Sequence, residues 1–266
     1  MKNKLSLNKK CSLFTMIHVK ALPGTPYYQG NFETILDQAM KEASIYKNAN
    51  VDGIIIENMH DAPYLKNIVG HEISTAMAVI GREIKKETKL PVGIQILAGA
   101  NQAALSAALA GGLDFIRAEG FVFAHVADEG IIESCAGKLL RFRKQMEATH
   151  IAIWADIKKK HSSHAITADV SIAETAHAAE FFGADALIVT GTETGKEADL
   201  HDLLDAKQAS KLPVIIGSGI TDQNLNKYKA HADALIVGSW IKKDSNWKNE
   251  PDPHKLKILL EKWHNN

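Results

Sequence analysis

Cysteine is scarce in this chain, which contains only Cys11 and Cys135 among its 266 residues. The two residues have neither a CxxC spacing nor the spacing of a metal finger, so the sequence gives no indication of a redox pair or a zinc module. We interpret both as ordinary buried thiols of a protein from a reducing compartment. The expected location is therefore the cytoplasm.

A surplus of either charge is also absent, because 31 Lys and Arg residues balance 31 Asp and Glu residues. This balance gives no reason to expect nucleic acid or an anionic membrane as a partner. Long apolar runs are missing as well. The stretch from Leu13 to Val19 is too short, and too soon interrupted by His18 and Lys20, to predict a secretory signal or a transmembrane segment.

Linkers and common nucleotide motifs are the third group of missing features. No linker rich in Pro, Gly or Ser divides the chain, which predicts one domain over residues 1–266 with its core over 12–243. A GxxxxGK loop is absent, so nothing supports a P-loop nucleotide hydrolase. No Gly-x-Gly pattern with an early acidic partner occurs, which disfavours a dinucleotide cofactor.

Eight short apolar segments are present, and they alternate between two types along the chain. Segments of one type are entered through an Asp, and segments of the other type resemble Leu-Pro-Val followed by further apolar residues. Near-continuous apolar runs of this length are typical of parallel strands covered on both faces. The predicted strands are Leu13–Val19, Val51–Ile56, Leu90–Ile96, Leu113–Ala118, Ile151–Ala155, Ala184–Val189, Leu212–Ile216 and Ala232–Val237.

The stretches between these strands have the patterns of helices. Apolar residues from Phe32 to Tyr46 recur at helical spacing after Asn31, which is a good N-cap, and Ser171 with Glu174 predicts a capping box. Further helices are predicted over approximately 71–87, 101–110, 132–147, 199–208, 222–229 and 253–263. Because each parallel crossover needs a covering helix, the chain is predicted to be an α/β protein with a single (β/α)₈ TIM barrel.

The ends of the last two predicted strands carry paired Gly-Ser turns. In barrels of this class the loops after strands seven and eight commonly bind phosphate. Glycines let the backbone approach an anion, and a short helix at Trp240–Ile241 would add N–H donors. The alternative is that these glycines serve the turns alone. The predicted phosphate-binding residues are Gly217, Ser218, Gly219, Gly238 and Ser239.

Polar residues stand at the ends of the other strands, on the face where barrel enzymes carry their chemistry. Glu57 and Asp156 are candidates for a general acid/base pair, and His18 is a third candidate because its ordinary pKa is near neutrality. Lys158 is a candidate to polarise a carbonyl or to form a Schiff base. Predicted substrate contacts are Lys20, Asn58, Gln95, Arg117, Glu119, His161 and Thr192.

Structural ion pairs are the alternative to catalysis, for example Arg117 with Glu57 or Glu119. The sequence predicts no cofactor, and its signal for a divalent metal is weak because these residues lack an HxxxH-type spacing. Two long loops, 120–131 and 158–171, are predicted lids over the mouth. The first, with Phe121 and Asp128, reaches the ligand or a neighbouring subunit, or packs on its own barrel; the sequence leaves these alternatives open.

Several segments together resemble the BtpA/SgcQ family. They are residues 16–24, 55–58, 120–130 with 136–141, 155–158 with His161, 187–191 and 216–221. The resemblance covers residues 12–243 and implies a TIM barrel of the ribulose-phosphate-binding type. The cyanobacterial member that gives the family its name is associated with photosystem I biogenesis. Bacterial relatives are linked with sugar-utilisation operons and have been labelled nucleoside triphosphatases.

The segment Asp156-Ile-Lys158 also looks like the start of the DxKxxD motif of orotidine-phosphate decarboxylase-like barrels. Residue 161 is His rather than Asp, and the segment falls on the fifth predicted strand, so decarboxylation is disfavoured. We therefore expect an enzyme that acts on a phosphorylated sugar or nucleotide-like metabolite by isomerase, epimerase or lyase chemistry, either as a monomer or as a homo-oligomer. The alternative is a non-catalytic BtpA-like assembly or stability factor for a membrane complex.

Overall fold

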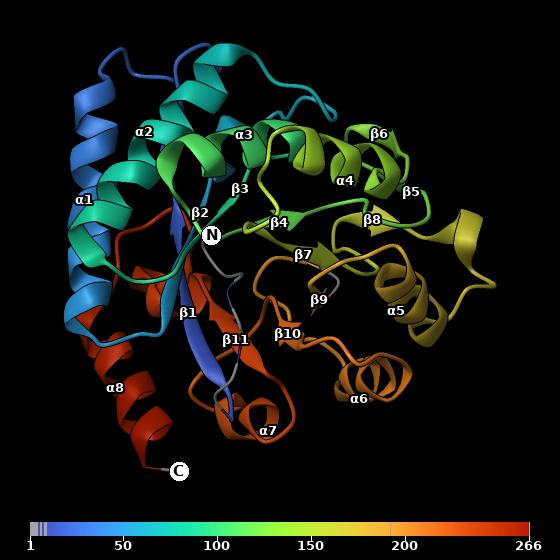
Figure 1. The fold of residues 1–266 in the computed structure, drawn as a ribbon. Helices are drawn as coiled ribbons and strands as arrows, with labels where there is room; N and C mark the ends of the chain where they lie inside the picture. The colour runs from blue at the N-terminus through green and yellow to red at the C-terminus, as the bar shows by residue number, and fades with distance from the viewer. Residues whose placement is uncertain (1–4, 6, 8–9, 192, 266) are drawn as a thin grey trace.

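Eight parallel strands form a closed barrel with helices around it, as Figure 1 shows. The computed structural model describes residues 5, 7, 10–191 and 193–265. Around the barrel the strand order is β1-β11-β10-β9-β7-β4-β3-β2, so strands that follow one another in the chain are neighbours and β1 closes on β11. The barrel strands are β1 (Ser12–His18), β2 (Gly53–Glu57), β3 (Val92–Gln95), β4 (Phe115–Ala118), β7 (Ala152–Asp156), β9 (Ala186–Val189), β10 (Val214–Ile216) and β11 (Ala234–Val237). The predicted fold class and all eight predicted strands are confirmed.

The helices connect these strands in the order that the sequence predicts. They are α1 (Phe32–Asn48), α2 (His71–Thr88), α3 (Asn101–Gly111), α4 (Ala136–Gln145), α5 (Ile172–Phe181), α6 (Leu200–Ala209), α7 (Leu225–Lys229) and α8 (Pro253–His264). Asn31 caps α1, and the capping box of Ser171 and Glu174 begins α5, as predicted. A short 3₁₀ helix, Ser239–Ile241, follows β11.

Two predicted helix starts are wrong by a few residues. The helix expected from 132 begins at Ala136, because Gly130–Ile132 forms strand β6 instead. The helix expected from 222 begins at Leu225, because the residues before it form a turn in which the Thr221 N–H donates to Asn224 Oδ1 at 2.8 Å.

The two long loops pair with each other instead of standing apart as separate lids. Strands β5 (His125–Ala127), β6 (Gly130–Ile132) and β8 (Ser162–Ser163) form a small antiparallel sheet in the order β6-β5-β8. Its register places Val126 opposite Ser163. We call these three strands the cap sheet. Each loop therefore restrains the other, which the sequence did not indicate.

Three aromatic rings, which we call the aromatic plug, fill the inside of the barrel below the mouth: Phe14, Phe115 and Trp154. The Phe115 and Trp154 rings stack with their centroids 3.7 Å apart, and Phe14 meets both rings edge-on. A Cβ atom at Gly53 would overlap the Phe14 ring, and one at Gly93 would overlap the Phe115 ring. The dense packing of the barrel interior leaves no room for both a Cβ atom and the aromatic ring at either position. These two glycines are therefore required by the aromatic plug.

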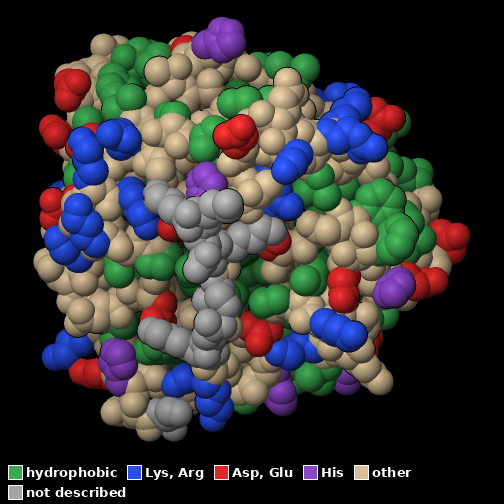
Figure 2. Space-filling view, in the orientation of Figure 1, with side chains coloured by type: hydrophobic (Ala, Val, Ile, Leu, Met, Phe, Trp, Pro, Cys, Tyr) green, Lys and Arg blue, Asp and Glu red, His purple; other side chains and the backbone are tan. Residues whose placement is uncertain are grey.

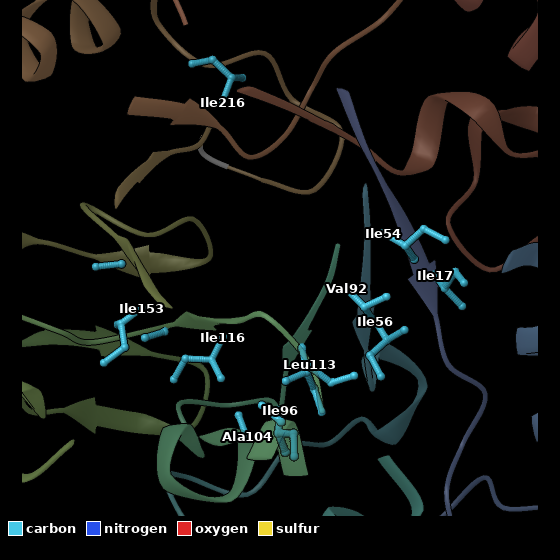
Figure 3. Packing of buried hydrophobic residues seen from close by; sticks show 14 of the residues in the cluster. Ile17, Ile54, Ile56, Val92, Ile96, Ala104, Leu113, Ile116, Ile153 and Ile216 are labelled. Atoms are coloured by element: carbon cyan, nitrogen blue, oxygen red, sulfur yellow. The ribbon is translucent and has the colours of Figure 1, made fainter. Parts of the chain in front are cut away.

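A larger apolar layer lies between the barrel and the helices. It consists of apolar helix residues and of alternate strand residues, which face outward because successive side chains of a strand point to opposite faces. Figure 3 shows part of this layer, in which Ile17, Ile56, Ile116 and Ile153 come from β1, β2, β4 and β7. Cys11 belongs to the same layer, and burial raises the pKa of its thiol to about 12.

An aspartate before every second strand ties that strand to the start of the preceding one. The backbone N–H of each aspartate donates to the carbonyl of one residue, and the side chain accepts from the N–H of the same residue. The pairs are Asp52 with Leu13, Asp114 with Val92, Asp185 with Ile153 and Asp233 with Val214. We call these residues the strand-start aspartates. They explain the repeated Asp in the sequence.

Basic side chains from helices α2, α4 and α6 reinforce three of these contacts. Lys85, Arg143 and Lys207 lie 2.6, 2.7 and 2.9 Å from the carboxylates of Asp114, Asp185 and Asp233, respectively.

Acidic and basic side chains are interspersed over the face shown in Figure 2, in agreement with the balanced composition. None of the helices in the described residues is long and apolar enough to span a lipid bilayer.

Asp114→Ala tests the role of the strand-start aspartates. The substitution removes the acceptor of the Val92 N–H, and we expect the free energy of unfolding to fall by about 2–3 kcal/mol, the range for hydrogen bonds to charged groups. Lys85→Met is the matched control, because it removes the ion pair and keeps the acceptor; its expected loss is about 1 kcal/mol or less. Urea denaturation measures both. Equal losses in the two variants would contradict a special role for the backbone contact.

Candidate functional site

The strands end in polar residues that face the inside of the barrel. His18, Glu57, Gln95, Arg117 and Asp156 occupy the last or near-last inward positions of β1, β2, β3, β4 and β7, and all five are buried. The register pairs His18 with Glu57 and Glu57 with Gln95. We call these five side chains the polar ring. Because inward positions recur every second residue along a strand, the polar ring lies directly above the aromatic plug.

A cavity of about 240 Å³ opens above this ring. One wall carries His18, Glu57, Arg117 and Lys160. Next to it, since β1 pairs with β11, lie the turns after β10 and β11, with Thr194 and Gly195 from the loop after β9. The predicted site residues that the structure brings together here are His18, Glu57, Arg117, Gly217, Ser218, Gly219, Gly238 and Ser239.

The turn wall offers backbone donors to the cavity. Within the described part of the chain, the N–H groups of Gly219, Ser239 and Trp240 have no acceptor. Gly219 has a φ of +72°, and a Cβ there would overlap the Lys196 carbonyl oxygen. This glycine therefore serves the turn and its packing as well as any ligand. Gly238 differs, because its Cβ would lie 3.2 Å from the His18 ring on the cavity side.

Ser218 braces the turn wall through its side chain. Its hydroxyl accepts a hydrogen bond from the Gly191 N–H at 3.0 Å and donates to the Lys196 carbonyl at 3.3 Å. The hydroxyl thus connects the end of β10 to the loop after β9. Its predicted contribution to phosphate binding would come from the backbone rather than from this oxygen.

Two titratable groups of the cavity have pKa values shifted in opposite directions. Burial holds the pKa of His18 well below its usual value, and Lys242 and Lys160 add to this effect, so the ring is neutral at pH 7. Burial raises the pKa of the Glu57 carboxyl, although Lys160 and Arg117 act in the opposite direction. His18 Nε2 lies 3.9 Å from Glu57 Oε2, and His18 Nδ1 has no partner among the described residues.

Asp156 is the counter-ion of Arg117, and its role as an acid or base stays a prediction. Arg117 Nε lies 3.1 Å from Asp156 Oδ2, and Arg117 Nη2 lies 3.0 Å from Oδ1. Both carboxylate oxygens are therefore engaged in a buried, bidentate pair. A structural ion pair of Arg117 was expected with Glu57 or Glu119, but the structure forms it with Asp156.

The predicted catalytic lysine, Lys158, lies outside the cavity. Its ammonium donates to the Val170 carbonyl, and its φ of +47° turns the backbone so that Lys160, two residues later, lines the cavity. Between them, Lys159 pairs with Glu119 at 3.1 Å. Sequence reasoning missed Lys160, although the run of three lysines after β7 contained it. The Lys160 N–H donates to Thr190 Oγ1 at 3.2 Å, which fixes the loop to the end of β9.

A second cavity of about 300 Å³ adjoins the first beside the turn between β5 and β6. Glu57, Lys160 and Thr194 line both cavities. The second one also carries Tyr64, Leu97, Glu119, Asp128, Glu129, His161 and Trp247. His161 is therefore in the mouth as predicted, with its Nε2 2.9 Å from Thr194 Oγ1. Trp247 also lines this cavity, and no sequence pattern pointed to it, because it follows the last barrel strand.

Two further predicted substrate contacts, Lys20 and Asn58, do not line either of these two cavities. Lys20 donates to the Lys248 carbonyl at 3.0 Å and lines a separate cavity with His60. Asn58 is buried, donating to Asp61 and accepting from the Leu97 N–H, so its amide supports the loop after β3.

Three further points concern the predicted ligands of the mouth. Gln95 is buried with its Oε1 unpartnered in the described structure. Thr192 lies outside the described residues. In the described ranges, no group of three or more His, Cys, Asp or Glu residues is placed to hold a metal ion.

Asp156→Asn and Glu57→Gln should differ in their effect on stability. The first leaves Arg117 buried without its counter-ion, so we expect the free energy of unfolding to fall by about 3–5 kcal/mol. The second neutralises a carboxyl that burial already disfavours as an anion, so we expect little change or a small gain. Chemical denaturation at pH 7 measures both. A similar large loss in both variants would show that Glu57 is a structural charge as well.

Solved structures of related architecture share the barrel. The chain superimposes on 3-hexulose-6-phosphate synthase with a TM-score of 0.60 and 16% identity, covering 94% of this chain and 99% of that one. For N-(5'-phosphoribosyl)anthranilate isomerase from Pyrococcus furiosus the TM-score is 0.56 and the identity 14%, with 96% and 100% coverage. At these identities the likeness shows the fold alone.

Sequence relatives are closer. An uncharacterized mitochondrial protein of Caenorhabditis elegans is 47% identical over 264 residues, covering 97% of this chain and 95% of the relative. The photosystem I biogenesis protein BtpA of Synechocystis is 33% identical, with 92% and 85% coverage. Residues 9–265 match the BtpA family as a whole. This chain therefore belongs to the BtpA family.

Proposed function

We propose that this protein is an enzyme that binds a phosphorylated small molecule and moves a proton on it by acid/base chemistry. The observation that carries the proposal is a cavity lined both by backbone donors and by Glu57, His18 and Lys160. The backbone donors suit the phosphate, because N–H groups at Gly-rich turns bind anions without a charged side chain. The side chains of Glu57, His18 and Lys160 are suited to the proton transfer.

The chemistry follows from the pKa shifts on that wall. A carboxyl with a raised pKa keeps its proton to a higher pH than an ordinary carboxyl, which is a property required of a general acid/base. His18 is neutral, and its Nε2 lies 3.9 Å from Glu57 Oε2 beside the same cavity. Isomerisation, epimerisation and carbon–carbon cleavage next to a carbonyl all need such a transfer. We therefore favour isomerase, epimerase or lyase chemistry.

The fold supports the same substrate class. The names of two structures with this architecture, 3-hexulose-6-phosphate synthase and N-(5'-phosphoribosyl)anthranilate isomerase, both contain a phosphorylated sugar. The name of the Synechocystis relative instead describes photosystem I biogenesis. An assembly factor is therefore the competing function, and the first experiment separates the two.

Phosphorylated sugars and nucleotides should stabilise the protein in a thermal-shift screen, and their dephosphorylated forms should not. A ligand present at 100 times its dissociation constant adds about 2.7 kcal/mol to stability. The same concentrations of inorganic phosphate serve as the minimal probe. Absence of stabilisation by every phosphorylated compound would favour the assembly-factor function.

Gly238→Ala tests the phosphate wall. The added methyl lies 3.2 Å from the His18 ring in the cavity, so we expect the affinity for the ligand found in the screen to fall by about tenfold or more. Gly137→Ala is the matched control, since its methyl meets only the flexible end of Arg141 in helix α4. Calorimetric titration measures both variants. Unchanged affinity in Gly238→Ala would place the phosphate elsewhere.

Glu57→Gln tests the proton transfer. The amide keeps the shape of the side chain and cannot exchange a proton, so turnover of the identified substrate should fall by about 10² or more while binding persists. Steady-state kinetics and calorimetry on the same preparation check the two parts. Retained turnover would exclude Glu57 as the acid/base.

A further inference from the structure

The three consecutive lysines after β7 have different partners. Lys158 donates to the Val170 carbonyl, and Lys159 Nζ lies 3.1 Å from Glu119 Oε1. For Lys160, by contrast, the described residues place no carboxylate oxygen within 4.0 Å of Nζ and give that nitrogen no hydrogen-bond acceptor. Of these three amines, Lys160 is thus the one available to a ligand.

The position of Lys160 is equally specific, because it lies where the two cavities meet. Lys160, Glu57 and Thr194 line both of them. A molecule with its phosphate on the turns after β10 and β11, and its other end in the second cavity, would pass this junction. The group that it presents to Lys160 would lie close to Glu57 at the same time.

We infer that Lys160 forms a Schiff base with a phosphorylated aldehyde or ketone held in the two adjoining cavities. The inference rests on the proposed phosphate site and narrows the substrate class to carbonyl compounds. It also makes the amine of Lys160 the nucleophile of a covalent reaction, with Glu57 as its acid/base.

The step balances with the groups that line the junction. The lone pair of neutral Lys160 Nζ adds to the carbonyl carbon, and a proton moves from the nitrogen to the oxygen to give a carbinolamine. The Glu57 carboxyl then protonates the hydroxyl, which leaves as water as the C–N double bond forms. The products are a protonated Schiff base on Lys160 and a Glu57 carboxylate that balances its charge.

The electrostatics of the junction support both partners. Burial and the nearby Arg117 lower the pKa of the Lys160 ammonium, while Glu57, Asp156 and Glu119 act in the opposite direction. The net direction increases the neutral, nucleophilic fraction of the amine. Burial likewise raises the pKa of Glu57 and keeps more of it protonated, as the dehydration step requires.

Borohydride trapping tests the inference on the full-length protein. The probe is dihydroxyacetone phosphate. Borohydride reduces the Schiff base to a stable secondary amine, and the mass added to the protein is that of the probe less one oxygen atom. We expect peptide mass spectrometry to find the adduct on Lys160. Trapping should fall by about tenfold or more in Lys160→Met and Lys160→Arg, because neither side chain offers a neutral amine. Lys158→Met is the matched control and should trap as the parent does.

Two further compounds separate the requirements of the reaction. Dihydroxyacetone has the carbonyl without the phosphate, and glycerol 3-phosphate has the phosphate without the carbonyl. Neither should give an adduct, but glycerol 3-phosphate should compete with the probe. Equal labelling of Lys158 and Lys160, or equal trapping of dihydroxyacetone, would overturn the inference, because either result indicates unspecific amine modification.

Calorimetric binding of the same probe distinguishes failure of this inference from failure of the proposed function. Binding that depends on Gly238 without any adduct on Lys160 would refute the Schiff base and leave the phosphate site standing. Absence of binding by dihydroxyacetone phosphate, glycerol 3-phosphate and inorganic phosphate alike would refute both.

Discussion

The register of the barrel strands determines which side chains reach the mouth, and the strand-start aspartates hold that register. Each of them bonds both backbone groups of one residue on the preceding strand, so a shift by one residue would break both bonds. Such a shift would also turn every side chain to the other face. Ile56 would then replace Glu57 in the cavity. The chemistry at the carboxyl ends of the strands thus depends on hydrogen bonds at their amino ends.

Two strands combine the aromatic plug with the buried ion pair. Phe115 and Trp154 stack inside the barrel, and two residues further along the same strands stand Arg117 and Asp156. The stacked rings fix the spacing of β4 and β7, which in turn suits the bidentate geometry of the pair. Asp156 binds two nitrogens of Arg117. Among the described residues, Glu57 therefore has no lysine or arginine in direct contact. Burial raises the pKa of both carboxyls, but Arg117 engages both oxygens of Asp156, whereas Glu57 lines the cavity.

The sequence predicted the fold because each strand, turn and cap is encoded locally. The pattern of an Asp followed by apolar residues, the N-cap Asn31 and the capping box at Ser171 can each be recognised from residues within a few positions of each other. It could not select among Lys158, Lys159 and Lys160, because a left-handed backbone at Lys158 changes which of them faces the cavity. The cap sheet was missed for a similar reason. Its pairing of Val126 with Ser163 joins two loops that are distant in sequence, and neither has a pattern of its own.

The cost of the buried polar groups is itself an argument for chemistry in this cavity. Glu57 and His18 are buried at 3.9 Å from each other, Lys160 has a lowered pKa, and His18 Nδ1 lacks a partner in the described residues. Apolar side chains at these positions would make a more stable barrel, since unpaired buried polar groups destabilise a fold. A protein that acted only through its outer surface in an assembly would gain nothing from them. In the proposed function, the backbone donors of the turns bind the phosphate and need no titratable side chain, so the three groups remain available for the reacting end of the ligand.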